Sequence, residues 1–371
     1  MDSVQTNYDC AIIGGGIAGL CLSIQLAKQG HSVILFEKHK YPFHKVCGEY
    51  VSNESFGFLS RLGLPLNEWN LPQINNIGIS SEKGFMLNAP LLLGGFGISR
   101  YMLDNELALT AKRNGVIILD QTKVADIHDH TIVTNKGNFE ARIIAGAFGK
   151  SNPVFAKDAV NAGSPDNYIG VKYHIRTDFP ASRIELHNFN NGYCGISKIE
   201  GDKYCLCYLA HADILKANNN SIKDMEATVL QKNPFLKTIF SNADFIFDNP
   251  VTVSNIKFKA RKTIDDRLIY LGDAAGCISP LTGNGMSMAS YTSFMLSELI
   301  DSYLRGQLAH HQLAELYVAK WNTYFLKRIK RGKQLQYLFG KKHLSDLALR
   351  MLNPFGKIKS GIIESTHGLP F

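Results

Sequence analysis

Three glycines near the start of the chain have the spacing of a phosphate-binding turn. Gly14, Gly16 and Gly19 follow a short β-like apolar run and open a helix-like run. Gly14 allows a tight turn, Gly16 lets the backbone approach a pyrophosphate, and Gly19 lets helix and strand pack closely. The helix start adds a positive dipole end. Glu37 ends the next apolar run, where a carboxylate can bind a ribose hydroxyl, so this region predicts a dinucleotide site.

A second glycine-containing segment begins near residue 268. An apolar strand-like run ends at Gly272-Asp273, and a loop containing Pro280, Gly283 and Gly285 leads into a helix-like run. Asp273 at the end of a strand can bind a sugar hydroxyl of an extended cofactor. The loop glycines let the backbone approach a flat ring, and the following helix start can stabilise negative charge that develops there. The segment therefore predicts the far end of the same cofactor.

Together the two segments resemble the FAD-binding signature of the p-hydroxybenzoate hydroxylase-like flavoproteins, which include aromatic hydroxylases, flavin halogenases and geranylgeranyl reductases. The resemblance covers roughly residues 7–300. It implies an α/β fold with a Rossmann-like FAD-binding domain and an antiparallel-sheet substrate domain, with FAD as cofactor and NAD(P)H as reductant. By this resemblance the cofactor-binding residues are Gly14, Gly16, Ile17, Ala18, Gly19, Glu37, Lys38, Cys47, Gly48, Arg100, Gly272, Asp273, Pro280, Gly283, Asn284, Gly285 and Met286.

Two shorter motifs extend the resemblance. The segment from Lys45 to Glu49 (K-V-C-G-E) is similar to the K-x-C-G loop of the geranylgeranyl reductases and of related polyketide-tailoring oxidoreductases, which runs beside the flavin. Cys47 is therefore either a thiol near the flavin ring or a packed structural thiol. Arg100 begins a segment similar to the family's R-x-x-L-D-x-x-L helix start, where the guanidinium donates paired hydrogen bonds to the cofactor phosphates. The predicted catalytic environment of the ring comprises Cys47, Gly283, Asn284 and Gly285.

Departures from the family patterns leave two activities open. Phe148 replaces the aspartate of the hydroxylases' G-A-D-G motif, which puts their nicotinamide step in doubt, and the halogenases' W-x-W-x-I-P string is absent. The strand around Tyr193 (G-Y-C-G-I-S) is closer to that of the polyketide-tailoring enzymes. We expect an NAD(P)H-driven monooxygenase that hydroxylates an aromatic or polyketide-like substrate. The alternative is reduction of C=C bonds in an isoprenoid or other lipid. A non-catalytic FAD-binding scaffold is disfavoured, because it has no use for a ring-lining loop.

The elements that position these residues divide the chain into discontinuous domains. Four strand-like runs in succession within 168–210 predict an antiparallel sheet separate from the nucleotide fold. The FAD-binding domain is predicted at 1–75, 100–165 and 255–305, the substrate domain at 76–99 and 166–254, and a basic helical C-terminal segment at 306–371. Helices are expected at 53–62, 101–114, 222–232, 285–304 and 310–332.

Composition and charge set the remaining expectations. The 371 residues are 45% hydrophobic and 19% charged, as in a folded globular protein. The seven cysteines form no C-x-x-C pair, so no metal site is expected. Residues 316–371 hold eleven Lys or Arg and two acids. This basic segment has two possible roles. It contacts an anionic membrane or an acidic carrier protein, or it is a helical cover over the substrate domain.

The expected partners are small molecules rather than nucleic acid. We expect a hydrophobic or aromatic substrate, free or bound to a carrier, in a cytoplasmic protein. The uncharged run at 10–27 contains three consecutive glycines and Gln25, which argue against a membrane span. Peripheral membrane contact through the basic segment is the remaining route to a bilayer.

Overall fold

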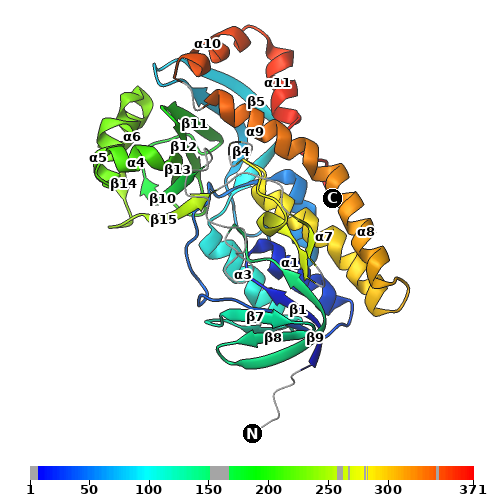
Figure 1. Ribbon diagram of the computed structural model, residues 1–371. Helices are drawn as coiled ribbons and strands as arrows, with labels where there is room; N and C mark the ends of the chain where they lie inside the picture. Colours follow the sequence, from blue (N-terminus) through cyan, green and yellow to red (C-terminus); the bar gives the residue numbers. More distant parts are fainter. Residues whose placement is uncertain are drawn as a thin grey trace.

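Two β-sheets form the framework of the computed structural model, which describes residues 7–150, 167–256, 262–265, 268–279, 281, 283–339 and 342–371 (Figure 1). The first sheet has the order β16 (Ile264–Asp265), β17 (Leu268–Tyr270), β9 (Gly137–Gly146), β1 (Asn7–Ile13), β2 (Val33–Phe36) and β6 (Ile117–Leu119), with the hairpin β7 (Val124–His128) and β8 (Thr131–Thr134) beside β9. Strands β17, β9, β1, β2 and β6 run parallel.

The parallel strands bring the ends of distant segments to one edge. The chain leaves β1 at Gly14, β2 at Glu37, β9 at Ala147 and β17 at Leu271. Carboxyl ends of parallel strands meet at one edge of a sheet, where ligands of such folds bind. Helices α1 (Ile17–Lys28), α3 (Arg100–Arg113) and α7 (Gly285–Leu304) pack together beside this sheet in one apolar core.

The second sheet is mostly antiparallel. Its order is β14 (Asp244–Phe245), β10 (Tyr168–Arg176), β13 (Tyr204–His211), β12 (Gly192–Lys198), β11 (Arg183–Phe189), β4 (Gln73–Ser80), β5 (Met86–Gly97) and β3 (Tyr50–Ser52), and β15 (Val251–Ile256) pairs with β10. Among these pairs, β11 and β4 are parallel. Successive residues of a strand point to opposite faces, so each strand contributes to two surfaces.

The two faces of the second sheet have different covers. Val171, Cys194, Ile196 and Leu206 lie on one face, in a core with α4 (Ala212–Ala217), α5 (Ile222–Thr228) and α6 (Pro234–Asn242). The alternate residues of the same strands lie on the other face, which is turned toward the first sheet and the C-terminal helices. A cavity can form on this second face because helices do not fill it completely.

The C-terminal helices continue from the first sheet to the second. Helix α8 (His310–Trp321) passes through a π-helical segment, η5 (Asn322–Leu326), into α9 (Lys327–Phe339), and α10 (Lys342–Leu352) and α11 (Gly356–Glu364) follow. Helices α10 and α11 contact β5, and α10 also contacts β11 (Figure 1). Among the described residues, none of the helices combines the length and apolarity needed to cross a bilayer.

The α/β class and the two kinds of sheet predicted from the sequence are confirmed. Of the remaining elements, η1 (Asn53–Ser55) and α2 (Phe56–Leu62) occupy the helix expected at 53–62, and α5 and η2 (Leu230–Lys232) occupy that at 222–232. The helical segment expected at 310–332 continues to Phe339, because Gly332 lies buried inside α9 and does not end it. The second sheet also includes β3, which lies within the range assigned to the FAD-binding domain, and β4, which begins in that range. The division into domains remains our proposal, with this earlier start for the second sheet.

Candidate functional site

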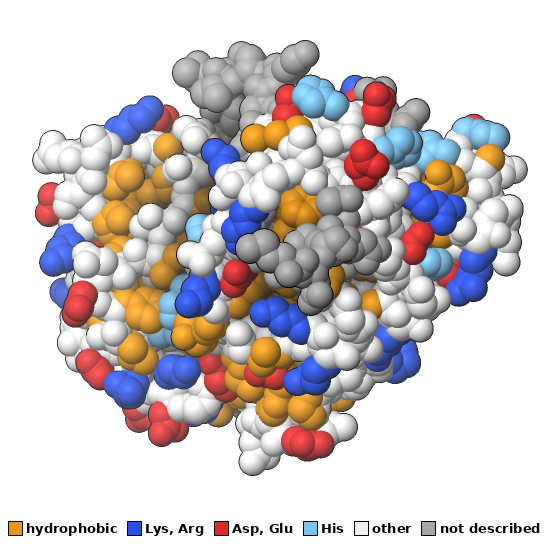
Figure 2. Space-filling model, turned by 90° about the horizontal axis from the view of Figure 1, so that it is seen from below, with side chains coloured by type: hydrophobic (Ala, Val, Ile, Leu, Met, Phe, Trp, Pro, Cys, Tyr) orange, Lys and Arg blue, Asp and Glu red, His pale blue; other side chains and the backbone are white. Residues whose placement is uncertain are grey.

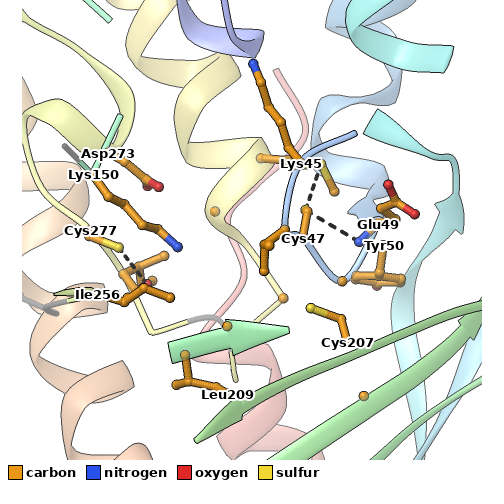
Figure 3. A pocket seen from close by; sticks show the side chains of 18 of the residues that line it. Lys45, Cys47, Glu49, Tyr50, Lys150, Cys207, Leu209, Ile256, Asp273 and Cys277 are labelled. Atoms are coloured by element: carbon orange, nitrogen blue, oxygen red, sulfur yellow. Dashed lines mark hydrogen bonds between the residues drawn. The ribbon is translucent and has the colours of Figure 1, made fainter. Parts of the chain in front are cut away.

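A cavity of about 1100 Å³ runs from the glycine turn to the C-terminal helices. Typical small-molecule pockets measure about 300–1,000 Å³, so this one has room for a large ligand or for two molecules. Its polar part is lined by Gly14, Gly16, Glu37, Arg100 and Asp273, and its apolar part lies between the second sheet and α9–α11. In Figure 3, Lys150 and Asp273 lie on one side of the cavity, and Cys47 and Cys207 on the other.

The three glycines of the turn are required for different reasons. Gly14 has a φ of +110°, and a Cβ there would lie 2.5 Å from the carbonyl oxygen of Ala147. A Cβ at Gly19 would lie 2.1 Å from the carbonyl oxygen of Gly14, so this residue permits close packing of helix and strand. A Cβ at Gly16 would meet only Lys45 Nζ at 3.6 Å and Arg100 Nη2 at 3.7 Å. Two cations thus face the turn where α1 begins.

These cations share one buried carboxylate. Arg100 donates two hydrogen bonds of 2.7 Å to the carboxylate oxygens of Asp104, and Lys45 Nζ lies 3.0 Å from Asp104 Oδ2. Burial raises the pKa of Asp104, but the charges of Arg100 and Lys45 outweigh burial and hold this pKa below its usual range. One carboxylate between two cations leaves a net positive charge beside the helix start, which suits a diphosphate. Sequence reasoning missed Lys45 and Asp104, although Arg100 and Asp104 stand four residues apart, the spacing of a helical ion pair.

Glu37 braces the turn from the next strand. Its Oε2 accepts a hydrogen bond from the Gly15 N–H at 2.9 Å, and its Oε1 accepts one from the His39 N–H at 3.0 Å. Tyr41 donates its hydroxyl to the Gly15 carbonyl at 2.6 Å. Carboxylate oxygens have further lone pairs, and Glu37 lines the cavity together with Lys38. Its role toward a ribose stays a prediction.

Lys150 adds a half-buried cation at the far side of the polar part. It lines the cavity near Asp273 and Cys277 (Figure 3). Burial lowers the pKa of Lys150, but the neighbouring Cys277 and Asp273 outweigh this effect, so the pKa lies above its usual range and the ammonium stays charged. Sequence reasoning missed this residue, although it directly follows the G-A-F-G string.

The loop carrying Cys47 is held between α7 and the second sheet. Cys47 Sγ lies 3.8 Å from Met286 Sδ and accepts from the Glu49 N–H at 3.5 Å, as drawn in Figure 3. On the sheet side, Cys205 Sγ donates to the Cys47 carbonyl at 3.2 Å, and Ser197 Oγ donates to the Gly48 carbonyl at 3.3 Å. Cys47 and Gly48 therefore lie in the cavity wall, as the ring-side prediction requires.

A buried ion cluster fixes the end of this loop. Glu49 has a left-handed φ of +56° and is fully buried, and its carboxylate pairs with Lys172 Nζ at 2.6 Å and His174 Nε2 at 2.7 Å. It also accepts from the Arg100 N–H at 2.8 Å. Burial raises the pKa of Glu49, but the His174 hydrogen bond and the Lys172 charge outweigh it, so the carboxyl stays ionised. The cluster joins β10, α3 and the Cys47 loop.

Several predicted site residues do not face the cavity. Asn284 is a correction, because it is fully buried, does not line the cavity, and donates its side-chain amide to the Thr366 carbonyl in the C-terminal segment. Gly19 and Gly272 also lie outside the lining; Gly272 has a φ of +60° and serves the turn after β17. Pro280 lies outside the described residues. The remaining predicted residues line the cavity.

The apolar part of the cavity has aliphatic walls. On the sheet side it is lined by Ile77 and Ile79 of β4, Leu87 and Leu91 of β5, and Ile184 and Leu186 of β11. On the helix side it is lined by Leu335 of α9, Ala348, Leu349 and Leu352 of α10, and Ile362 and Ile363 of α11. We call this region the apolar arm. Tyr193, Cys207 and Leu209 lie between the arm and the polar part.

Comparisons with known proteins agree with this geometry. A family model described as an NAD(P)-binding Rossmann-like domain matches residues 12–49. Conditioned medium factor receptor 1 of Dictyostelium discoideum is 27% identical, over 86% of this chain and 69% of that protein. The digeranylgeranylglycerophospholipid reductase of Methanococcus vannielii is 23% identical, over 86% and 84% respectively. The 1H-pyrrole-2-carbonyl-(peptidyl-carrier protein) brominase of Pseudoalteromonas luteoviolacea is 24% identical, over 81% and 79%.

Solved structures share the whole fold. The flavin-dependent brominase Bmp2 has a TM-score of 0.80 at 19% identity, covering 97% of this chain and 93% of that one. A geranylgeranyl bacteriochlorophyll reductase-like protein from Thermoplasma acidophilum has a TM-score of 0.78 at 16% identity, covering 97% and 96%. The probable FAD-dependent monooxygenase PqsL of Pseudomonas aeruginosa has a TM-score of 0.72 at 17% identity, covering 91% and 98%. With the glycine turn, the basic cradle and the two sheets, this likeness in sequence and in fold supports an FAD-dependent oxidoreductase.

Proposed function

We propose that the protein reduces a C=C bond in the aliphatic chain of a lipid-like substrate, with FAD as its cofactor and NAD(P)H as the reductant. The observation that carries this proposal is the apolar arm. Its walls are formed mainly by branched aliphatic side chains from three strands and three helices, and such walls match a long hydrocarbon chain rather than a compact polar ring. Several curated relatives at 23–25% identity are digeranylgeranylglycerophospholipid reductases, which supports the same class of reaction.

The residues of the polar part fit FAD. Because Gly16 has no Cβ, the start of α1 is open to a phosphate group. The cluster of Arg100, Asp104 and Lys45 supplies a net positive charge for the diphosphate. Glu37 would bind the ribose of the adenosine half, and Asp273 and Lys150 would hold the ribityl and pyrophosphate region. Gly283, Gly285 and Met286 would face the ring. When bound, FAD would supply the hydride chemistry of the reaction.

The surroundings of the ring suit an apolar reacting group. The walls there include Cys47, Cys207, Leu209 and Ile256. These side chains would exclude water and do not require a polar substrate atom as a hydrogen-bond partner. Saturation of a C=C bond adds a hydride to one carbon and a proton to the other. Cys47, held at the cavity wall by the Glu49 N–H, is the residue that we propose as the proton donor. Burial raises the pKa of Cys207 to about 12, so that neighbouring thiol stays protonated and uncharged.

Hydroxylation of an aromatic or polyketide-like substrate, free or carrier-bound, is the second candidate. It is favoured by Tyr193, whose ring lines the cavity between the arm and the polar part. Burial raises the pKa of Tyr193 well above its usual value, so the phenol remains a neutral hydrogen-bond donor for a substrate oxygen. A brominase that acts on a carrier-bound pyrrole is among the relatives, which supports a carrier-bound substrate of this kind.

Product masses separate the two candidates. The flavin-loaded protein is supplied with NAD(P)H and a detergent-dispersed polyprenyl lipid, in air and without oxygen. Reduction predicts a product heavier by a pair of hydrogens, formed in both conditions. A product that gains one oxygen atom, and forms only in air, would replace the first candidate with the second. The Cys47→Ala variant is expected to keep its flavin and lose turnover. Cys10→Ala, which alters a buried thiol outside the cavity lining, is expected to keep turnover.

A further inference from the structure

Helices α10 and α11 expose a row of large apolar side chains at one end of the molecule. The exposed fractions are 38% for Leu344, 56% for Leu347, 64% for Met351, 55% for Phe355 and 51% for Ile358. Leu344, Leu347 and Met351 are spaced three and four residues apart, so they share one side of α10. We call these five residues the outer row. Isolated exposed apolar residues are ordinary on protein surfaces, but several of them within two consecutive helices and their connection indicate a contact surface.

The same two helices carry a second apolar row, which lines the cavity. Ala348, Leu349 and Leu352 of α10 and Ile362 and Ile363 of α11 face the apolar arm. On α10 the two rows lie on opposite sides, because Leu349, which is 4% exposed, stands two positions from the exposed Leu347 and Met351, and two positions turn a helix by more than half a turn. At α10, therefore, the thickness of one helix separates the arm from the outside of the molecule.

Charge identifies the partner that fits this surface. Within residues 322–337 and 344–371, the exposed charged side chains are six cations (Lys327, Lys330, Arg331, Lys333, Arg350 and Lys357) and one acid (Glu364). The opposite end of the molecule differs, since Figure 2 shows Lys and Arg interspersed with Asp and Glu on the face seen from below. Arg350 and Lys357 lie in the same stretch of chain as the outer row, and the other four cations lie on α9, which packs against α10. Exposed apolar side chains accompanied by cations are the pattern of a helix that lies in the interface of an anionic bilayer. A contact between two copies of this chain would instead bring these cations together.

We propose that α10 and α11 dock on the surface of an anionic membrane. The outer row enters the boundary between headgroups and acyl chains, and the surrounding lysines and arginines contact the headgroups. In this orientation the apolar arm lies directly above the bilayer. A hydrocarbon chain can then pass between the helices from the bilayer into the arm, a delivery step that rests on the proposed function.

Vesicle co-sedimentation of the full-length, flavin-loaded protein tests the docking. Vesicles contain either phosphatidylcholine alone or phosphatidylcholine with phosphatidylglycerol, at low and high salt. We expect binding to the anionic vesicles at low salt, weakened by salt. Lys357→Glu should weaken it about fivefold or more, and Leu347→Ser with Met351→Ser about tenfold or more. Leu109→Ser is the matched control, because Leu109 is 41% exposed on α3, away from the outer row, and should bind like the unaltered protein.

Several results would overturn the docking proposal. Equal sedimentation with and without vesicles would do so, as would unchanged binding of the Leu347→Ser, Met351→Ser protein when its flavin content and melting temperature are intact. A dimer that these two substitutions dissociate, without vesicle binding, would assign the surface to a second copy of the chain. Turnover of detergent-dispersed lipid is measured in parallel. Vesicle binding without turnover contradicts the proposed function alone, and turnover without vesicle binding contradicts the docking alone.

Discussion

Gly14 and Gly16 belong to one turn, but the structure gives them different reasons to be glycine. Gly14 requires a positive φ and has backbone within 2.5 Å of where a Cβ would lie, so its reason is the fold itself. Gly16 has an extended backbone with a φ of −88°, and a Cβ there would meet only the ends of flexible Lys45 and Arg100 at ordinary contact distance. The protein without cofactor has room for a side chain at Gly16. We propose that the reason for glycine there is the diphosphate of the cofactor.

Gly16→Val therefore separates cofactor binding from folding. We expect the variant to fold with an unchanged circular dichroism spectrum and to bind FAD about tenfold more weakly or worse, a loss of at least ~1.4 kcal/mol. The branched side chain would fill the space through which the phosphates approach the start of α1. Equilibrium titration with FAD measures the effect. Unweakened FAD binding would contradict the assignment of this turn.

Glu49 gives a stability prediction with a defined pH dependence. Its carboxylate is buried against Lys172 and His174, so Glu49→Gln leaves a buried ammonium without its counterion and should lower the free energy of unfolding by about 3–5 kcal/mol. The folded-state pKa of Glu49 is lowered, whereas its unfolded value is about 4.3. The stabilisation is therefore complete above that value and is lost as the pH falls through the folded-state pKa.

Urea unfolding between about pH 6 and about pH 3 measures this effect. The stability difference between the unaltered protein and Glu49→Gln should shrink toward acid pH. Glu140→Gln, at an exposed position on β9, serves as the control and should change stability by less than about 0.5 kcal/mol. A difference that stays constant across the range would show that the ionised carboxylate of Glu49 does not supply the stabilisation.

At the scale of elements, the sequence predicted the features that depend on local patterns better than those that depend on long-range contacts. The turn between β1 and α1, the helix at 285–304 and the four strands within 168–210 have strong local periodicity and appear as predicted. Asn284 shows where local patterns fail. It lies in the predicted loop, but its side chain donates to a backbone carbonyl 82 residues away instead of facing the cavity. The Glu49 cluster joins residues 123 and 125 positions apart, and no local spacing indicates such a pairing.

The inner side of α10 should set the length of chain that the arm accepts. Leu349 is 4% exposed and lines the arm, so Leu349→Phe should obstruct it. We expect kcat/KM for long polyprenyl lipids to fall by about tenfold, with short-chain substrates and FAD content unaffected. Leu347→Phe places the same ring on the outer row of the same helix. In a detergent assay this control should keep the original chain-length preference, and an identical profile for both variants would argue against the arm as the chain site.

At the scale of the molecule, the sequence identified the cofactor more clearly than the substrate. The residues proposed for FAD stand in contiguous motifs, since a diphosphate and a ring are bound largely by turns and helix starts. The apolar arm instead collects single residues from β4, β5, β11 and three C-terminal helices. Each of these residues is an ordinary buried or half-buried aliphatic side chain in its own element. Their common surface exists only after the second sheet and the C-terminal segment meet.

An anaerobic single-turnover experiment tests the central claim most directly. The flavin of the purified protein is reduced chemically without oxygen and then mixed with a polyprenyl lipid, and absorbance follows the return of oxidised flavin. We predict reoxidation that depends on the lipid and yields one saturated C=C bond for each flavin. Absence of any bound flavin, or reoxidation only when oxygen is admitted, would contradict the account.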